Sequence, residues 1–166
     1  EVLSYRAFAE RLWAACRDTD DPVLLTPRQS RALWERVIAE SPEAARLLGT
    51  GGTARAAEDA WRRAAAYRIE LDGLLAEHRF PDFVAFVRWC REYRSRLADA
   101  RWIDAAALDG LLAEKVARGA RLEPFATIGL ADFEPAPSER AVLDALRSAG
   151  VRIRSHELRA TSGRAV

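Results

Sequence analysis

Apolar residues recur at every third or fourth position along most of this chain, which is the spacing of amphipathic helices. One such face carries Leu33, Trp34, Val37 and Ile38. The pattern predicts helices over residues 4–18, 28–41, 41–49, 54–78, 80–100 and 102–119. We therefore expect the first two thirds of the chain to be almost entirely helical.

Residues typical of helix ends support these boundaries. Side chains that can cap a first turn stand at Ser4, Thr26, Ser41, Thr53, Asp104 and Ser138. Gly49, Gly119 and Gly150 follow predicted helices, where a left-handed residue often ends the helix. The glycine-rich segment 49–53 is expected to be a hinge, and Gly73 to bend the long helix that follows it.

The pattern changes near residue 121, where an apolar run predicts the first strand, a buried one, over 122–133. A helix over 137–150 and an alternating strand over 151–158 follow. Two strands joined by a helix pair in parallel with a right-handed crossover. Because a parallel sheet needs cover on both faces, we expect this last third to be one edge of an α/β domain. The tail 159–166 is expected to be frayed or cut within that domain.

Composition narrows the class of protein. The 166 residues are 49% hydrophobic and 31% charged, which is typical of a soluble globular protein with a sizeable core. No apolar run approaches the ~18 residues that span a bilayer, and no signal peptide pattern is present. Two cysteines without metal-ligand spacing indicate a reducing cytoplasm. The chain has no Met and begins at Glu1 inside a helical pattern, so we expect it to be a piece of a longer protein.

The net charge of +1 does not indicate a nucleic-acid partner, but arginines and aromatic residues are interleaved on two predicted helices. Arginine binds phosphates and aromatic rings stack on bases, so these positions are candidate DNA contacts. The candidates are Arg62, Arg63, Arg88, Trp89, Arg91, Tyr93 and Arg94. Acidic residues lie among them, which leaves open a solvated surface of salt bridges instead.

Asp132 and Glu134 end the first predicted strand, where a nucleotide hydrolase carries its metal-binding carboxylate. Alternation puts both side chains on one face if the strand stays extended. The competing interpretation is that they cap the turn and the start of the next helix. The loop 48–54 has no neighbouring Lys and no preceding strand, so it is expected to be a hinge rather than a P-loop. His78 and His156 belong to no ligand-spaced cluster, and we predict no catalytic residue, metal or cofactor.

Four segments of the chain together resemble one protein family. They read LLTPRQSRALWERVI, AEDAWRRAAAYRI, FPDFVAFVRWCREYRSRLADARWIDAAALDGLLAE and IGLADFEPAPSERAVLDALRSAGVRI. In this order they resemble the AddB-like proteins of bacterial DNA repair. These proteins are inactivated superfamily I helicases, often joined to a C-terminal PD-(D/E)XK nuclease. The similarity runs from residue 4 to residue 157 and is most specific around Trp34 and over 80–112.

The resemblance implies a mainly α fold, a helical bundle like helicase subdomain 1B. It also implies a small flanking parallel α/β element from a truncated RecA-like domain. Residues 1–50 would be the helical part of domain 1A, 51–120 the all-helical 1B-like subdomain, and 121–166 the strand–helix–strand return to domain 1A. Asp132 and Glu134 would occupy the motif II position with its adjacent acid pair lost. A P-loop would precede the chain, and a second motor domain and nuclease would follow it.

We therefore expect a non-catalytic, helicase-like part of a cytoplasmic DNA-repair protein. Its role would be structural, with single- or double-stranded DNA as a candidate partner. A helicase or nuclease subunit is a further candidate partner, and a membrane is not. The alternative is a helical protein–protein interaction module without DNA affinity. Salt-dependent DNA binding that weakens when Arg91 and Arg94 are removed would separate the two. An active ATPase is a third hypothesis, and it would require stabilisation by nucleotide that vanishes on Asp132→Ala.

Overall fold

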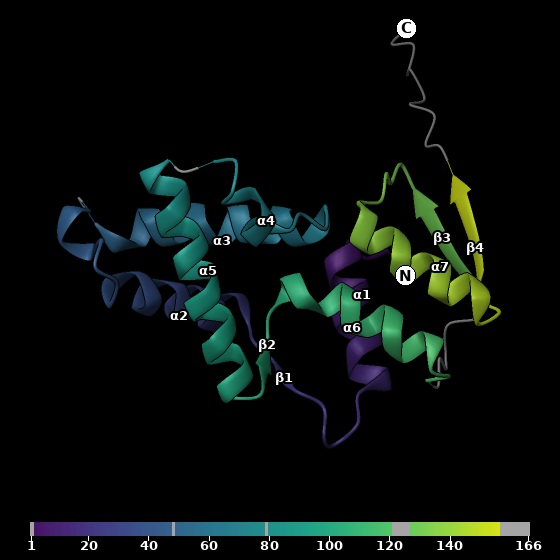
Figure 1. Cartoon of the computed structure of the whole chain (residues 1–166). Coiled ribbons are helices and arrows are strands. Elements are labelled where there is room, and N and C mark those ends of the chain that lie inside the picture. Colours follow the sequence, from purple (N-terminus) through teal and green to yellow (C-terminus); the bar gives the residue numbers. More distant parts are fainter. Residues whose placement is uncertain (1, 48, 79, 121–126, 157–166) are drawn as a thin grey trace, which may run out of the picture.

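The chain folds as a mainly helical protein with two small parallel sheets (Figure 1). The computed structural model describes residues 2–47, 49–78, 80–120 and 127–156. Its elements are α1 (Tyr5–Cys16), β1 (Val23–Leu24), α2 (Pro27–Ala39), the 3₁₀ turn η1 (Ala44–Arg46), α3 (Thr50–Ala66), α4 (Leu71–Leu74), α5 (Pro81–Asp99), β2 (Trp102–Ile103), α6 (Ala105–Ala117), β3 (Thr127–Ala131), α7 (Pro137–Ser148) and β4 (Arg152–His156). The mainly helical character predicted from the hydrophobic pattern is therefore confirmed.

Three of the predicted N-caps hold the first turns of their helices. The Ser4 hydroxyl accepts a hydrogen bond from the Ala7 amide at 3.3 Å. Thr26 and Gln29 form a reciprocal capping box, in which Gln29 Oε1 lies 2.9 Å from the Thr26 amide. Asp104 caps α6 through one carboxylate oxygen. Local sequence therefore determines where α1, α2 and α6 begin.

The predictions of a short helix over 41–49 and of a hinge over 49–53 are both wrong. The short helix expected at 41–49 is only the single turn η1, because its carbonyls make hydrogen bonds of the 3₁₀ type. The expected hinge at 49–53 is instead the first turn of α3, which begins at Thr50 and contains Gly51 and Gly52. Glycine lowers helix propensity, but packing of α3 against α2 outweighs that cost here.

The expected long helix 54–78 ends early, at a residue that is not a usual helix stop. Arg68 has a φ of +55°, in the left-handed region that Gly most often occupies at this position. The Arg68 amide donates to the Ala65 carbonyl at 3.1 Å, and the Ile69 amide donates to the Ala64 carbonyl at 2.8 Å. This pair of bonds is a Schellman motif, so the chain reverses here and not at Gly73.

Helix α7 confirms its predicted stop but not its predicted cap. Gly150 has a φ of +90°, and Gly119 at the end of α6 has a φ of +85°. Ala136 occupies the N-cap position of α7, and the Ser138 side chain is buried instead of capping. The Glu139 carboxylate accepts a hydrogen bond from the Ala136 amide at 2.8 Å and takes over half of a capping box.

The buried apolar side chains form two cores that follow other boundaries than the predicted ones. The insert core, from Leu25 to Leu97, lies among α2, α3, α4 and α5, which we call the helical insert. The flank core, from Ala9 to Val151, lies among α1, α6, α7 and the strands. Figure 1 shows the insert on the left and the flanks on the right. Helix α2 thus packs with the insert although 1–50 was predicted as one block, and α6 packs with the flanks although 51–120 was predicted as another.

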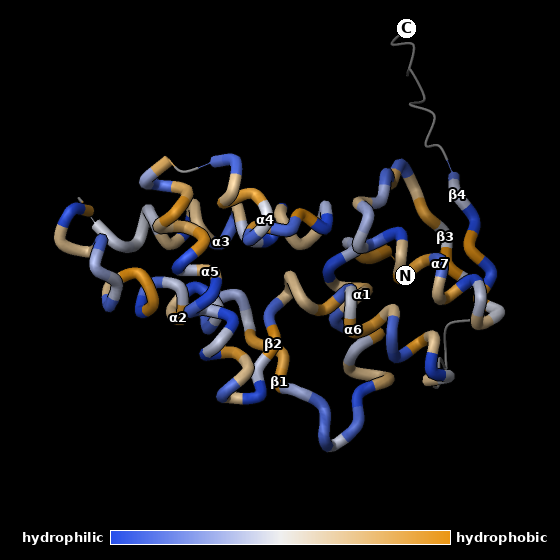
Figure 2. Tube along the Cα trace, viewed as in Figure 1, coloured by the Kyte–Doolittle hydropathy of each residue, from blue (hydrophilic) through white to orange (hydrophobic). Residues whose placement is uncertain are grey.

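Strands β1 and β2 connect the insert to the flanks. They pair in parallel in the register Val23↔Trp102 and Leu24↔Ile103, so the chain enters and leaves the insert through adjacent strands. Residues 102 and 103 are therefore strand, and the predicted helix 102–119 begins only after Asp104. Figure 2 shows blue and orange alternating along the helices, as expected for helices with one buried side. Among the described residues, no helix combines the length and the hydrophobicity needed to cross a membrane.

Strands β3 and β4 pair directly and in parallel, and α7 connects them in sequence, which confirms the predicted strand–helix–strand unit. The expectation that the first strand is buried is wrong for its described part. Thr127, Gly129 and Ala131 are exposed, and Ile128 and Leu130 are half-buried. The reason is that α7 covers only one face of the sheet. The rest of the predicted strand, the end of its partner and the tail 159–166 lie wholly or partly outside the described residues.

Candidate functional site

The predicted basic surface of α5 exists, but its charges are paired. Arg88 Nη1 lies 2.5 Å from Glu43 Oε1, between α2 and α3 in sequence. Arg91 and Arg94 lie 2.7 and 3.0 Å from the two carboxylate oxygens of Asp72 in α4. Hydrogen bonds from these two arginines lower the pKa of Asp72. A phosphate that bound α5 would have to displace a carboxylate from each arginine.

The two candidate arginines of α3, Arg62 and Arg63, differ from those of α5 in their ion pairing. Arg62 Nη2 lies 2.8 Å from Asp59 Oδ1, one turn earlier on the same exposed face. Arg63 is exposed, and within the described residues it has no ion pair. An exposed pair on a helix contributes only about 0.3–0.5 kcal/mol, so Arg62 can exchange its partner at little cost. Helix α3 therefore offers phosphate one arginine, Arg63, with no carboxylate to displace within the described residues, whereas each candidate arginine of α5 has one.

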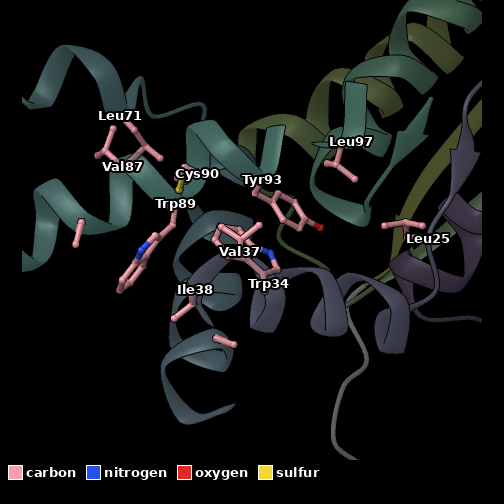
Figure 3. Close-up of a cluster of buried hydrophobic side chains, with 14 residues drawn as sticks. Leu25, Trp34, Val37, Ile38, Leu71, Val87, Trp89, Cys90, Tyr93 and Leu97 are labelled. Atoms are coloured by element: carbon pink, nitrogen blue, oxygen red, sulfur yellow. The ribbon is translucent and has the colours of Figure 1, made fainter. Parts of the chain in front are cut away.

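The aromatic members of the predicted surface point inward. Trp89 is 7% exposed and Tyr93 is fully buried, and Figure 3 shows both inside the insert core. The Tyr93 ring stacks on Trp34 with centroids 4.2 Å apart. Residues three or four apart share one side of a helix, so Arg88 and Arg91 lie together on the exposed side of α5 while Trp89 and Tyr93 lie together on the buried side. Bases cannot stack on Trp89 or Tyr93 in this structure.

A buried polar network lies beneath this surface. The Tyr93 hydroxyl lies 2.8 Å from Ser30 Oγ and donates to Asp104 Oδ2 at 3.2 Å. The Trp61 indole N–H donates to the same oxygen at 2.8 Å. Ser30 belongs to α2, Trp61 to α3, Tyr93 to α5, and Asp104 to the junction between β2 and α6. The Asp104 carboxylate therefore ties α3 and α5 of the insert directly to the start of α6, and Ser30 joins α2 to this network through Tyr93.

The second oxygen of Asp104 completes the network. Oδ1 accepts hydrogen bonds from the Ala106 and Ala107 amides, both at 3.1 Å. Burial raises the pKa of Asp104, and its hydrogen bonds oppose that effect. Burial also raises the pKa of the Tyr93 hydroxyl, and the Asp104 charge adds to the rise, so the phenol stays protonated and donates. The side chains of Ser30, Trp61, Tyr93 and Asp104 all have hydrogen-bond partners, as expected of a buried network with a structural role. We call these four residues the Asp104 lock.

The space beside the lock is too small for a substrate. The adjoining cavity has a volume of about 20 Å³, and its lining includes Ser30, Glu58, Trp61, Arg62 and Asp104. A volume of this size holds one water molecule. Sequence reasoning placed Asp104 correctly as a cap but had no signal for its other partners, because they are distant in sequence.

A second carboxylate hub ties the flanks together, and sequence reasoning missed it. Tyr5 of α1 donates to Asp109 Oδ1 at 3.0 Å, and Ser138 of α7 donates to Asp109 Oδ2 at 2.7 Å. Burial and then the Asp109 charge raise the pKa of Tyr5. The available signal was an acidic residue within the apolar run AAALDGLLA of α6. Ser138 was expected to cap α7, and its inward position is explained by this bond.

Asp132 and Glu134 do not form a paired acidic site. Asp132 has a φ of +45°, so the strand ends at Ala131 and the alternation that would align both carboxylates is broken. The Asp132 amide donates to the His156 carbonyl at 3.1 Å, and both carboxylate residues are exposed. The described residues contain no group of three side chains placed to hold a metal ion. Asp132 and Glu134 were alternatively expected to cap the start of α7, but it is the Glu139 carboxylate that accepts a hydrogen bond from the Ala136 amide there.

The sequence matches no protein-family model, and no curated protein sequence matches it.

Proposed function

We propose that this chain is a non-catalytic scaffold element of an AddB-like DNA-repair protein, in which it fixes a helical insert on flanking elements. The four-segment resemblance supports the family, and the arrangement of a helical insert between two paired strands is compatible with it. Among the described residues, Asp132 and Glu134 are exposed side chains without a shared metal site, which supports a role other than catalysis.

The Asp104 lock is the observation that carries the proposal. A hinge between insert and flanks would be expected to have small side chains and few cross-bonds. Here Trp61 and Tyr93 from the insert both donate to a carboxylate that caps the first turn of α6. A buried and fully bonded network resists rotation about the two-residue strands. The insert is therefore held in one orientation, as a scaffold requires.

DNA contact within this proposal belongs to α3 and not to α5. Arg88, Arg91 and Arg94 already join α5 to its neighbours, whereas Arg63 carries an unpaired charge within the described residues. Arg62 lies beside it with only a local, exposed partner. We therefore assign any phosphate contact of the insert to Arg62 and Arg63.

The second candidate function is a helical protein–protein interaction module without DNA affinity. An apolar groove lined by Val23, Leu33 and Trp102 favours it, because two of these side chains are substantially exposed. Val23 is 54% and Trp102 is 39% exposed. Exposed apolar side chains gathered in one groove are typical of surfaces that contact other proteins.

Fluorescence anisotropy with labelled single- and double-stranded oligonucleotides separates the two functions. For DNA contact, affinity should fall steeply between about 50 and 200 mM salt. Arg62→Ala/Arg63→Ala should lower the salt slope for a single strand by about 1.4, at ~0.7 for each phosphate contact. The matched control is Arg28→Ala/Arg46→Ala, which removes the same charge from exposed positions elsewhere. Absence of binding at low salt would refute DNA contact by this chain and favour the interaction module.

A further inference from the structure

The β3–β4 sheet has one face that the described part of the chain leaves exposed. On the side of α7, Ile128 and Ile153 pack against the flank core. The opposite side, called the open face below, consists of Thr127, Gly129, Ala131, Arg152, Arg154 and His156. All six residues are exposed. Parallel sheets occur almost only with both faces covered, so an open face on a parallel pair is a surface that another element can cover.

The open face carries a concentrated positive charge. Arg152 and Arg154 point to the same side of β4, and within the described residues neither is in an ion pair. The face contains no carboxylate, because Asp132 and Glu134 come after the end of β3. This differs from α5, where each candidate arginine has a carboxylate partner. Charge complementarity therefore requires an acidic partner.

The dimensions of the open face fit an α-helix. Strands of five residues are roughly 17 Å long, which a helix of about 11 residues spans. Arg152 and Arg154 are separated by roughly 6.6 Å along the strand, and positions i and i+4 of a helix by about 6 Å. In the register of the sheet Gly129 pairs with Arg154 and Ala131 with His156, and both residues of β3 are small, which leaves a shallow strip for apolar side chains beside Arg154. The six residues include no Phe, Tyr or Trp ring on which a nucleic-acid base could stack.

We propose that the open face binds an acidic amphipathic helix of a partner protein. Carboxylates at positions i and i+4 of that helix pair with Arg152 and Arg154, and its apolar side chains lie over Gly129 and Ala131. A second copy of this chain does not fit, because an isologous contact would place arginines opposite arginines. The proposal does not rest on the DNA-repair assignment, since it uses only the charge and shape of the sheet.

The test is selection from a displayed library of helical peptides about 14 residues long, with the 166-residue chain as target. The Arg152→Glu/Arg154→Glu variant serves as the counter-target. We expect the enriched peptides to be amphipathic helices with Asp or Glu at i and i+4. Anisotropy with the best labelled peptide should then show a loss of at least about tenfold in affinity for the counter-target. A peptide with both acids changed to Arg should recover binding to that variant.

Two further variants separate charge from shape and from general effects. Gly129→Val fills the shallow strip without changing charge, and its Cβ would meet only His156 at an ordinary 3.7 Å. Valine favours strands, so this variant should stay folded while its peptide affinity falls. Arg28→Glu/Arg46→Glu makes the same charge change away from the open face and should bind the peptide like the wild type.

Several results would overturn the proposal. Enriched peptides that bind the counter-target equally, or that lack paired acids, would remove the role of the two arginines. Unchanged affinity in Gly129→Val would place the peptide elsewhere. A labelled oligothymidine that displaces the peptide and binds more tightly would make the face a nucleic-acid surface. A dimer in sedimentation that dissociates in Arg152→Glu/Arg154→Glu would make it a self-association surface.

Discussion

Replacement of Asp104 by Ala tests whether the buried carboxylate locks the insert to the flanks. The substitution removes the acceptor of four hydrogen bonds, two from the amides of α6 and one each from Trp61 and Tyr93. Tyr93 keeps Ser30 as a partner at 2.8 Å. The Trp61 N–H and the first turn of α6 are left without their acceptor.

The expected loss of stability follows from these contacts. Loss of the N-cap costs about 1 kcal/mol. A partly buried Trp61 N–H without an acceptor costs about 1–2 kcal/mol more. Removal of a desolvated carboxylate offsets part of this, because burial raises the pKa of Asp104. We expect a net loss of about 1–2 kcal/mol, and a shift in Tm of roughly 2–4 °C for each kcal/mol in a chain of this size.

Urea denaturation followed by tryptophan fluorescence and circular dichroism measures the effect. The control is Asp144→Ala, which removes an exposed carboxylate paired only with Arg147 and should stay within about 0.5 kcal/mol. A double-mutant cycle with Trp61→Phe should show a coupling of about 1 kcal/mol, because that variant removes the donor that Asp104→Ala leaves unpaired. A loss below 1 kcal/mol for Asp104→Ala, or strict additivity in the cycle, would refute the lock.

Three further predictions follow from the same contacts. Because the folded-state pKa of Asp104 is raised, its contribution to stability is fully present below the unfolded pKa and is lost as pH rises through the folded value. Between about pH 4 and 7, the urea midpoint of Asp104→Asn should therefore fall less with rising pH than the urea midpoint of the wild type. The same pH dependence in both proteins would contradict this. Burial raises the pKa of Cys90 to about 12, so iodoacetamide should modify this thiol only as fast as the protein opens. Mass spectrometry after native labelling checks this, with urea-unfolded protein as the positive control and rapid native labelling as the contrary result. Trp34 is fully buried and stacked on Tyr93, so Trp34→Ala should cost about 3–5 kcal/mol in urea denaturation. The exposed Trp102→Ala is the matched control, and an equal loss in both would contradict the insert core as described.

The sequence by itself determined the features that depend on near neighbours. Ser4, Thr26 and Asp104 begin their helices because a cap needs only the next two or three residues. Gly119 and Gly150 end theirs because glycine adopts a positive φ without strain. The parallel pairing of β3 and β4 follows from the helix between them.

Only the tertiary structure decided which side of α5 is buried and what its arginines contact. Sequence spacing places Arg88 and Arg91 on one side of a helix and Trp89 on another, but the insert core selects the side that faces inward. The partners of α5 in its ion pairs with other segments, and the side-chain donors to Asp104, lie between 11 and 56 residues away in sequence. Such contacts depend on how several helices pack at once, and no local pattern encodes them. The physical reason is that burial and pairing are properties of the assembled core, whereas caps and helix stops are properties of a few consecutive residues.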